Sequence, residues 1–335
     1  MGTGMRAIGR CLALSIALTA CAHQDARREH EPNRTPADSG ADLDASTTAG
    51  TFVPSVSAGY DHSCGIDRAG RLVCWGRGDS EQLAAPAGTF VQVDANQRHS
   101  CALDTEQHAQ CWPGRRNDAP SGTFTQVCTG RSHSCAVRTD GSLQCWGESG
   151  AAELDVPSGH FERVGCGDGF SCALRSDATV ACWGAGYTTT ARRMTPPSEK
   201  FRRLAVGARH ACAIDDAGQV ACWGDDAFGE TKPPAEVFRD VTAGSAFTCG
   251  LHEDGTVACW GSDPAGCLDD EPSYCLSYGE ARPPVDRFTQ ISAGTYHACG
   301  MLMSGTVKCW GAGEASDAAL RPPHYGQAVP PADFP

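Results

Sequence analysis

From residue 51 onward, apolar residues occur in short runs separated by polar segments that contain glycine or proline. The stretch HSCGIDRAGRLVCWG, from His62 to Gly76, places two such runs around the sequence Asp67-Arg68-Ala69-Gly70. β-Branched residues with glycine-containing turns about every ten residues are typical of strands rather than helices. Gly70 suits the left-handed backbone that a tight hairpin turn requires. The pattern therefore predicts β-hairpins and an all-β fold.

The hairpin sequence occurs seven times in all, and all seven tryptophans follow directly after the second cysteine of a copy. The two cysteines of each copy are ten positions apart, as Cys64 and Cys74, Cys101 and Cys111, Cys135 and Cys145, Cys172 and Cys182, Cys212 and Cys222, Cys249 and Cys259, and Cys299 and Cys309. A length of 335 residues would usually suggest two domains. A repeat of this period instead indicates one supersecondary unit used repeatedly, so residues 51–335 are expected to form one ring of repeats.

The spacing of ten predicts a disulfide within each hairpin. If Ile66 faces Leu72, then Cys64 faces Cys74, with Cβ atoms about 4.5–5.5 Å apart, which allows a bridge. Trp75 then points to the opposite face, where its diagonal neighbour is the small Gly65 and an indole has room. Both faces of each hairpin are therefore expected to be buried against neighbouring units.

A zinc site is the alternative for these cysteines. Five copies carry a histidine two positions before the first cysteine: His62, His99, His133, His210 and His297. Cys₂His sites can bind zinc, but Phe170 and Phe247 replace the histidine in two copies that keep both cysteines. The short Cys-x₂₋₄-Cys spacing of most structural zinc sites is also absent. The pattern favours disulfides without a metal or cofactor, and histidines that form structural hydrogen bonds.

Within residues 51–335, four further cysteines lie outside the hairpins. Cys128 and Cys166 occupy nearly the same place in adjacent copies, which puts an inter-repeat bridge within reach. Cys267 and Cys275 would pair within the long segment 262–284, which also contains Tyr274 and Tyr278 beside three acids. A bridge would preorganise that loop for binding; a neutral insertion is the alternative, because longer surface loops cost little closure entropy.

The N-terminus indicates export. Arg6 and Arg10 precede a ten-residue apolar run that is too short to span a bilayer, and the run ends in Leu-Thr-Ala-Cys21. This resembles the lipobox of bacterial lipoproteins, which implies a signal peptide over 1–20, lipidation of Cys21 and an outer-membrane anchor, facing the periplasm or the outside. An ordinary signal peptide cut near Ala20 is the alternative. Residues 21–50 lack periodicity and are expected to be a disordered tether.

The net charge and the cysteine content limit the classes of expected partner and indicate the compartment. The net charge of −13 argues against nucleic acid and against anionic membrane surfaces, apart from the lipid anchor. Twenty cysteines in an exported chain are typical of an oxidising compartment.

The repeat, Ala-Gly-x-x-His-Ser-x-Ala-Leu-x-x-x-Gly-x-Val-x-x-Trp-Gly, is similar to that of the regulator of chromosome condensation superfamily. The resemblance covers about residues 51–335 and implies a seven-bladed β-propeller with one disulfide per blade. The sequence Pro-Ala-Gly-Thr-Phe at 86–90 resembles the bacterial exported branch that includes β-lactamase inhibitory propellers. One departure is Asn96, which replaces the glycine of Ala-Gly and is the best substitute for it at positive φ.

The chain ends predict how the ring closes. Phe52–Val56 resembles the Phe-x-x-Val segment that precedes each repeat, with one extra residue that suggests a bulge. Pro330–Phe334 stands where another such segment would begin. We expect the two segments to meet.

Function is predicted less directly than fold. No common catalytic motif is present, and the sequence favours a non-enzymatic, monomeric scaffold that binds an unknown protein at the cell envelope. The residues between Gly and His differ in every copy and lie on one rim, which the resemblance to the inhibitory propellers implies is the contact surface. The expected anchors are Tyr60, Arg98, Arg131, Arg209 and Tyr296. The alternatives are an inhibitor of a secreted or periplasmic hydrolase, and a propeller lyase or hydrolase.

Overall fold

A computed structural model describes residues 52–113, 118–148, 152–184, 194–262, 279–312 and 326–334. The chain divides into two compact units, Met1–Pro36 and Ala37–Pro335, and every described residue belongs to the second. Strands are the regular structure of these residues, which confirms the all-β prediction. Over the described ranges, no helix has the length and apolar character needed to cross a bilayer.

The strands form seven three-stranded antiparallel sheets, here called blades 1 to 7 in chain order. Blades 1 to 4 are β1 (Ser55–Ala58), β2 (His62–Ile66), β3 (Leu72–Gly76); β4 (Phe90–Ala95), β5 (Ser100–Asp104), β6 (Ala109–Trp112); β7 (Phe124–Thr129), β8 (His133–Arg138), β9 (Leu143–Gly147); and β10 (Phe161–Cys166), β11 (Phe170–Arg175), β12 (Val180–Gly184). Blades 5 to 7 are β13 (Arg203–Val206), β14 (His210–Ile214), β15 (Val220–Gly224); β16 (Asp240–Ala243), β17 (Phe247–Leu251), β18 (Val257–Gly261); and β19 (Phe288–Ala293), β20 (His297–Leu302), β21 (Val307–Gly311).

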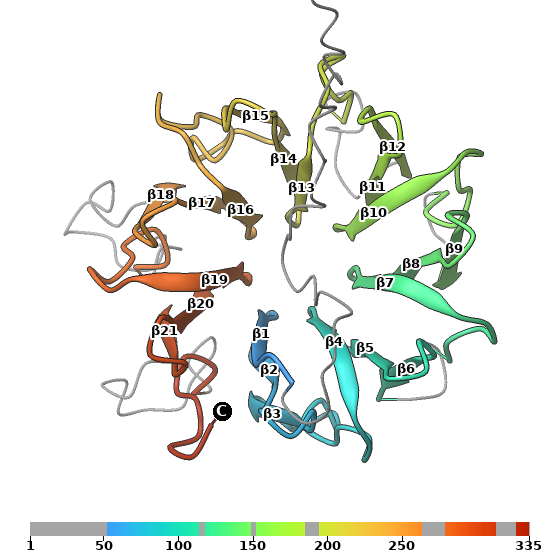
Figure 1. Ribbon diagram of the computed structural model, residues 1–335, viewed down its shortest axis with the longest axis vertical. Helices are drawn as coiled ribbons and strands as arrows, with labels where there is room; N and C mark the ends of the chain where they lie inside the picture. Colours follow the sequence, from blue (N-terminus) through green and yellow to red (C-terminus); the bar gives the residue numbers. More distant parts are fainter. Residues whose placement is uncertain are drawn as a thin grey trace, which may run out of the picture. The chain divides into compact units, whose positions relative to one another are not determined.

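The blades are arranged radially around a common centre, with the first strand of each blade innermost (Figure 1). Each innermost strand contacts the innermost strands of the two adjacent blades, and β1 contacts β19, so the ring is closed. The seven-bladed β-propeller predicted from the resemblance is therefore confirmed.

The hairpins have the predicted register. Cys64 lies directly opposite Cys74, and the same pairing recurs in all seven blades. Each pair is bonded, with Cα atoms 3.9–4.1 Å apart. Gly70 has a φ of 77°, as the turn chemistry predicted. An eighth disulfide joins Cys128 of blade 3 to Cys166 of blade 4, with Cα atoms 5.6 Å apart.

The bulge predicted within Phe52–Val56 is not found in the pairing of the first blade. β1 pairs with β2 without a register shift. Shifts occur instead directly after the leading phenylalanine of four other blades, at Phe90, Phe124, Phe161 and Phe288. In blade 2 the bulge accompanies a Phe90 buried between blades 1 and 2 and a Gln92, two positions on, that lines the ring centre.

Neighbouring blades pack the cysteine face of one against the tryptophan face of the next. Cys64 and Ile66 of blade 1 share a buried cluster with Phe90 and Trp112 of blade 2. The indole N–H of Trp112 donates to the carbonyl oxygen of Gln82, in the segment between the two blades, at 2.9 Å. Equivalent bonds join Trp183 to Glu153, Trp260 to Glu230, Trp310 to Glu280 and Trp75 to Gln327. Both hairpin faces are thus buried, as predicted.

The space beside each tryptophan is shared with a phenylalanine. Over the small Gly300 lies the Phe288 ring, which packs against Trp310 with ring centroids 5.6 Å apart. Phe238 covers Gly250 beside Trp260 in the same way. The small position therefore accommodates the phenylalanine, not the indole alone as the sequence suggested.

The five repeat histidines link adjacent blades. Nε2 of each lies 2.7–2.8 Å from the hydroxyl of a serine or threonine in the next blade: His62 with Ser100, His99 with Ser134, His133 with Ser171, His210 with Thr248 and His297 with Ser63. Where phenylalanine replaces histidine, at Phe170 and Phe247, the partner positions are Ala211 and Ala298. Histidine is thus matched with a hydroxyl and phenylalanine with alanine, which confirms the structural role predicted for the histidines.

The last segment of the chain closes the ring on blade 1. Phe334 lies over Gly65 and packs against Trp75 with centroids 5.4 Å apart. Phe334 therefore takes the place that Phe238 and Phe288 hold in their own blades. Phe52 lies against Gly70 instead. The last segment completes blade 1, as predicted, and both segments contact that blade through different residues, Gly70 and Gly65.

Candidate binding surface around the central cavity

A cavity of about 210 Å³ lies at the centre of the ring, lined by the innermost strands and by the loops that join them to the middle strands. Its lining is mostly small apolar, amide and hydroxyl side chains. The charged residues that line it are Asp94, Asp168 and Asp240, and no lysine, arginine or histidine is among its described lining residues. The cavity is therefore acidic.

Most polar side chains of the lining have a structural task. The innermost strands expose edge N–H groups that lack a strand partner, and side chains of the preceding blade satisfy them. The amide of Gln92 exchanges two hydrogen bonds with the backbone of Val127, at 2.9 and 3.0 Å. The hydroxyls of Ser57, Thr242 and Ser292 accept from the N–H groups of Ala95, Ala293 and Ala58.

Asp94 occupies the position equivalent to Ser57 in blade 2. Its carboxylate accepts the N–H of Thr129 at 2.6 Å, the Thr129 hydroxyl at 2.7 Å and the more distant Ser57 hydroxyl at 3.5 Å. Burial raises the pKa of Asp94 to about 6, against the lowering effect of the Thr129 and Ser57 hydrogen bonds. Sequence reasoning missed this residue. The available signal was the polar residue after valine in Phe-Val-Gln-Val-Asp-Ala, which strand alternation turns toward the ring centre.

In blade 3 the same position holds Cys128, whose bridge to Cys166 replaces the side-chain to backbone hydrogen bond used elsewhere. This disulfide also lines the cavity.

The rim loops between the first and second strands surround the mouth of the cavity. Tyr60 lines the cavity, and its hydroxyl lies 2.9 Å from that of Tyr296, with the rings in an edge-to-face arrangement at 5.0 Å. Arg98 and Arg209 are exposed and Arg131 is half-buried, and none of the three lines the cavity. The structure therefore brings together the two tyrosines, while the arginines belong to the surrounding rim.

Asp168 lies between two rim arginines. Burial raises the pKa of Asp168, and the charges of Arg131 and Arg209 act in the opposite direction. The rim from blade 3 to blade 5 is therefore partly charge-compensated.

The glycines before these loops are required for close approach, not for positive φ. A Cβ on Gly59 would lie 2.8 Å from the Asn96 carbonyl oxygen, and one on Gly294 would lie 2.1 Å from that of Gly59. Asn96 is absent from the residues with positive φ, so the explanation predicted from its type is wrong. Backbone hydrogen bonds such as Thr295 N–H to Gly59 O at 3.0 Å join neighbouring rim loops and hold their spacing.

The opposite end of the ring has a different chemistry. There the turns between second and third strands carry one capping aspartate in six blades: Asp67, Asp104, Asp140, Asp177, Asp215 and Asp254. The hydrogen bond from the Ser142 hydroxyl lowers the pKa of Asp140. Many of the acids that the sequence left unassigned are therefore turn caps.

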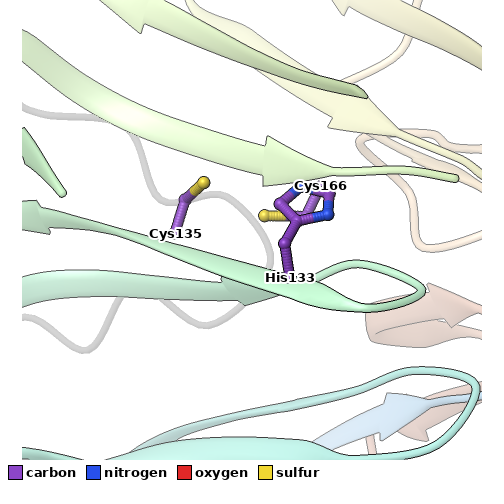
Figure 2. Close-up of side chains that lie close together, drawn as sticks. All are labelled: His133, Cys135 and Cys166. Atoms are coloured by element: carbon purple, nitrogen blue, oxygen red, sulfur yellow. The ribbon is translucent and has the colours of Figure 1, made fainter. Parts of the chain in front are cut away.

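One histidine and cysteine group was a candidate for metal binding. Ligand atoms of His133, Cys135 and Cys166 lie within 4.8 Å of one another at the interface of blades 3 and 4 (Figure 2). Both cysteines are in disulfides, so neither offers the thiolate that zinc requires. His133 already bonds Ser171 through Nε2. These atoms lie close together because the Cys135–Cys145 and Cys128–Cys166 disulfides are adjacent.

Several predicted residues lie outside the described ranges. These are Cys21, the tether over 21–50, Cys267, Cys275, Tyr274 and Tyr278. The start of the segment that holds the last four is described: the N–H of Ser262 donates to the carbonyl oxygen of Ala246, in the rim loop of blade 6, at 2.8 Å. That segment therefore leaves the ring on the rim side.

A known repeat matches five stretches of the chain. The regulator of chromosome condensation (RCC1) repeat matches residues 55–82, 124–151, 201–230, 238–267 and 288–315, which begin in blades 1, 3, 5, 6 and 7. The chain contains RCC1 repeats in five places. Blades 2 and 4 lie outside the matched stretches but have the same three strands and the same disulfide. No curated protein matches the chain in sequence.

Solved structures share the propeller fold. The ectodomain of the Arabidopsis thaliana receptor kinase ACR4 is 24% identical, with a TM-score of 0.62 over 78% of this chain and 95% of that one. The ectodomain of the Physcomitrella patens receptor kinase CR4 is 24% identical, with a TM-score of 0.63 over 78% and 74%. Human WBSCR16 is 16% identical, with a TM-score of 0.52 over 72% and 84%. At these identities the likeness shows the fold alone.

Proposed function

We propose that the ring is a non-enzymatic scaffold that binds a protein through the rim around its central cavity. The observation that carries this proposal is the contrast between a fixed frame and variable loops. Eight disulfides and a closed set of blade interfaces hold the ring, while the two residues of each rim loop differ in every blade. A rigid frame that gathers unlike side chains at one opening is the usual arrangement of a recognition surface.

The buried histidine and serine pairs do not support catalysis. His210 and Thr248 are fully buried, so no substrate reaches them. The Thr248 hydroxyl donates to the Glu230 carbonyl oxygen at 3.0 Å and therefore accepts the Nε2–H of His210. A hydroxyl bonded in this way is a structural link rather than an activated nucleophile.

The setting is the cell envelope. The disulfides are typical of an oxidising compartment, and the proposal places the ring on the bacterial outer membrane through lipidated Cys21 and the tether that follows. Changing Cys21 to Ala should release the folded protein from membranes, and a variant that still fractionates as a lipidated protein would contradict the anchor.

Photo-crosslinking from paired positions tests the binding surface. Arg209 and Asp216 are exposed and lie at opposite ends of β14, and Arg98 and Glu106 flank β5 in the same way. A photoreactive residue at 209 or 98 should capture one specific protein from envelope extracts, whereas one at 216 or 106 should not. Capture from the turn end alone would place the binding surface on the wrong side.

The segment 262–284 is proposed to extend this surface, with Tyr274 and Tyr278 as contacts and a Cys267–Cys275 bridge. Its start beside the rim loop of blade 6 supports this. Replacing residues 264–278 by a short Gly-Ser link leaves in place the Glu280 carbonyl oxygen that accepts from Trp310. The change should weaken capture from position 209 while leaving the thermal midpoint almost unchanged. A narrower form of the function, inhibition of a secreted or periplasmic hydrolase, would make the captured protein a hydrolase whose activity falls on binding.

A further inference from the structure

The three aspartates that line the cavity differ in the groups that compensate their negative charge. Asp168 has Arg131 and Arg209 nearby, as described above. Asp240 accepts the N–H of its neighbour Val241 at 2.9 Å. Asp94 has three hydrogen-bond donors, but it takes part in none of the ion pairs among the described residues. Asp94 is half-buried at the cavity wall. A partly desolvated carboxylate without a cation is costly, and its hydrogen bonds offset only part of that cost.

A second acceptor lies in the same loop region. The side-chain carbonyl oxygen of Gln97 is buried and receives no hydrogen bond from any described residue, and Gln97 lines the cavity. Its loop begins at Asn96, two positions after Asp94. An unpaired buried acceptor in a folded protein calls for a donor.

An aromatic ring completes the site. Tyr60 of blade 1 also lines the cavity, and its N–H donates to the carbonyl oxygen of Asn96 at 3.4 Å. The interface of blades 1 and 2 therefore presents a carboxylate, an unpaired carbonyl oxygen and a tyrosine ring at the cavity. All three attract a positively charged donor, the ring through its electron-rich face.

We propose that this subsite, Asp94, Gln97 and Tyr60, receives the ammonium group of a lysine side chain presented by the protein partner. The inference rests on the proposed function, because the rim must be the docking surface. An ammonium group carries three donors that can point to separate acceptors. A guanidinium needs a parallel pair of acceptor oxygens, but the hydroxyls of Thr129 and Ser57 already engage the two oxygens of Asp94. A calcium ion would need six or more oxygen ligands.

Binding of simple probes to the oxidised full-length protein tests the chemistry. The probes are n-butylammonium, the peptide acetyl-Gly-Gly-Lys-Gly-Gly-amide and the same peptide with its lysine Nε-acetylated, followed by calorimetry or NMR. We expect the ammonium and the lysine peptide to bind and the acetylated peptide not to bind. Equal binding of the two peptides would overturn the proposal.

Variants locate the site. Asp94→Asn keeps the shape of the side chain and should weaken binding of the lysine peptide by about tenfold, since a close charge pair is lost. Asp240→Asn is the matched control, because it removes a charge from the same cavity outside the subsite, and it should change binding less than about threefold. Equal effects of the two variants would mean that only the general field of the cavity matters, and the subsite would be wrong.

Two further outcomes separate this inference from the proposed function. If position 209 captures a partner but Asp94→Asn leaves that capture unchanged, the lysine subsite fails and the scaffold stands. If n-butylammonium binds through Asp94 but the lysine peptide does not, the site takes a free amine, and docking of a protein lysine is overturned. Thermal midpoints of both variants confirm that the ring is intact.

Discussion

His210 and Thr248 show how a single pair of residues joins two blades. Because the threonine hydroxyl donates to the Glu230 carbonyl oxygen, the histidine must donate through Nε2. Burial lowers the pKa of His210 to about 4, so the ring is neutral near pH 7. The same carbonyl oxygen also accepts the indole N–H of Trp260. One backbone oxygen thus gathers residues from both blades and from the segment between them.

Replacing His210 and Thr248 together by phenylalanine and alanine, as at Phe247 and Ala298, should be tolerated. Thr248→Ala alone leaves the His210 Nε2–H unpaired and should lower the free energy of unfolding by about 1–3 kcal/mol. His210→Phe alone should also destabilise, because the larger ring meets a hydroxyl. The double variant reproduces the Phe247 and Ala298 arrangement, so its cost should be smaller than the sum of the two single costs. Urea denaturation with the disulfides intact measures this, and strict additivity would contradict the pairing.

The same pair predicts a pH effect. Burial lowers the pKa of His210 from 6.5 to about 4, so the unfolded chain binds a proton that the folded protein excludes. Stability is complete above pH 6.5 and is lost as the pH falls toward 4, by at most about 1.4 kcal/mol per pH unit for each histidine. Several buried acids, Asp94 among them, shift in the opposite sense, so the total slope mixes both contributions.

Comparing the unmodified protein with the His210→Phe, Thr248→Ala variant isolates the contribution of His210 to the pH dependence of stability. Between pH 7 and pH 5, the His210→Phe, Thr248→Ala protein should lose less stability than the unmodified protein by about 2 kcal/mol. The readout is the free energy of unfolding at the two values. Identical losses in the two proteins would mean that His210 is not excluded from protonation.

At the scale of elements, the hairpins were predictable and the innermost strands were not. A constant spacing of ten residues determines that Cys64 opposes Cys74, whatever the surrounding loops do. The bulge after Phe90 was not predictable, because the spacing of Phe and Val is the same whether the residues between them are flat or bulged. The role of Asp94 was also hidden, since a polar residue in a strand looks solvent-facing until the ring places a cavity beside it.

Cys128 and Cys166 define the one covalent link between blades in the described part of the chain. Removing it by the double change to Ala should lower the free energy of unfolding by about 2–4 kcal/mol, because the closed loop is long. The seven hairpin bridges should remain. Denaturant unfolding measures the loss, and an unchanged midpoint would contradict a stabilising bridge.

Changing Cys166 alone should alter the disulfide pairing, which the double change does not. Cys128 lies opposite Cys135 in the register of β7 and β8, so Cys166→Ser would leave a free thiol facing an existing disulfide. Attack of that thiolate on Cys135 would release Cys145. Peptide mapping should find a fraction with a Cys128–Cys135 bond, which the double variant cannot form. A Cys135–Cys145 bond that stays intact in every molecule would contradict this expectation.

For the whole molecule, closure depends on residues far apart in the chain. Phe334 is buried against Trp75, and Phe334→Ala should cost about 3–5 kcal/mol by leaving a cavity at the seam. Phe228 is 50% exposed, so Phe228→Ala is the matched control and should change stability by less than about 0.5 kcal/mol. Thermal unfolding compares them, and similar effects would show that the seam is not closed by Phe334.

The ring and its closure followed from the repeat count and from the sequence at the two ends. The binding surface followed only in part. Which rim loops vary is visible in the sequence, and Tyr60 and Tyr296 do meet. That Arg98 and Arg209 lie outside the cavity lining depends on side-chain direction in a loop, and no repeat pattern encodes that direction.

The bond from Trp75 to Gln327 has a consequence for the order in which the protein is completed. As the chain enters the oxidising compartment, blade 2 can finish its interface once its own strands have emerged, because Gln82 precedes Trp112. Blade 1 emerges first, yet its acceptor carbonyl and its covering phenylalanine follow all six other blades in the chain. Its tryptophan face must therefore stay solvent-exposed until those blades have emerged, while Cys64 and Cys74 can already be oxidised locally. The first blade to emerge cannot be finished before the seventh, and that interval is when the chain is most exposed to aggregation and to chaperones.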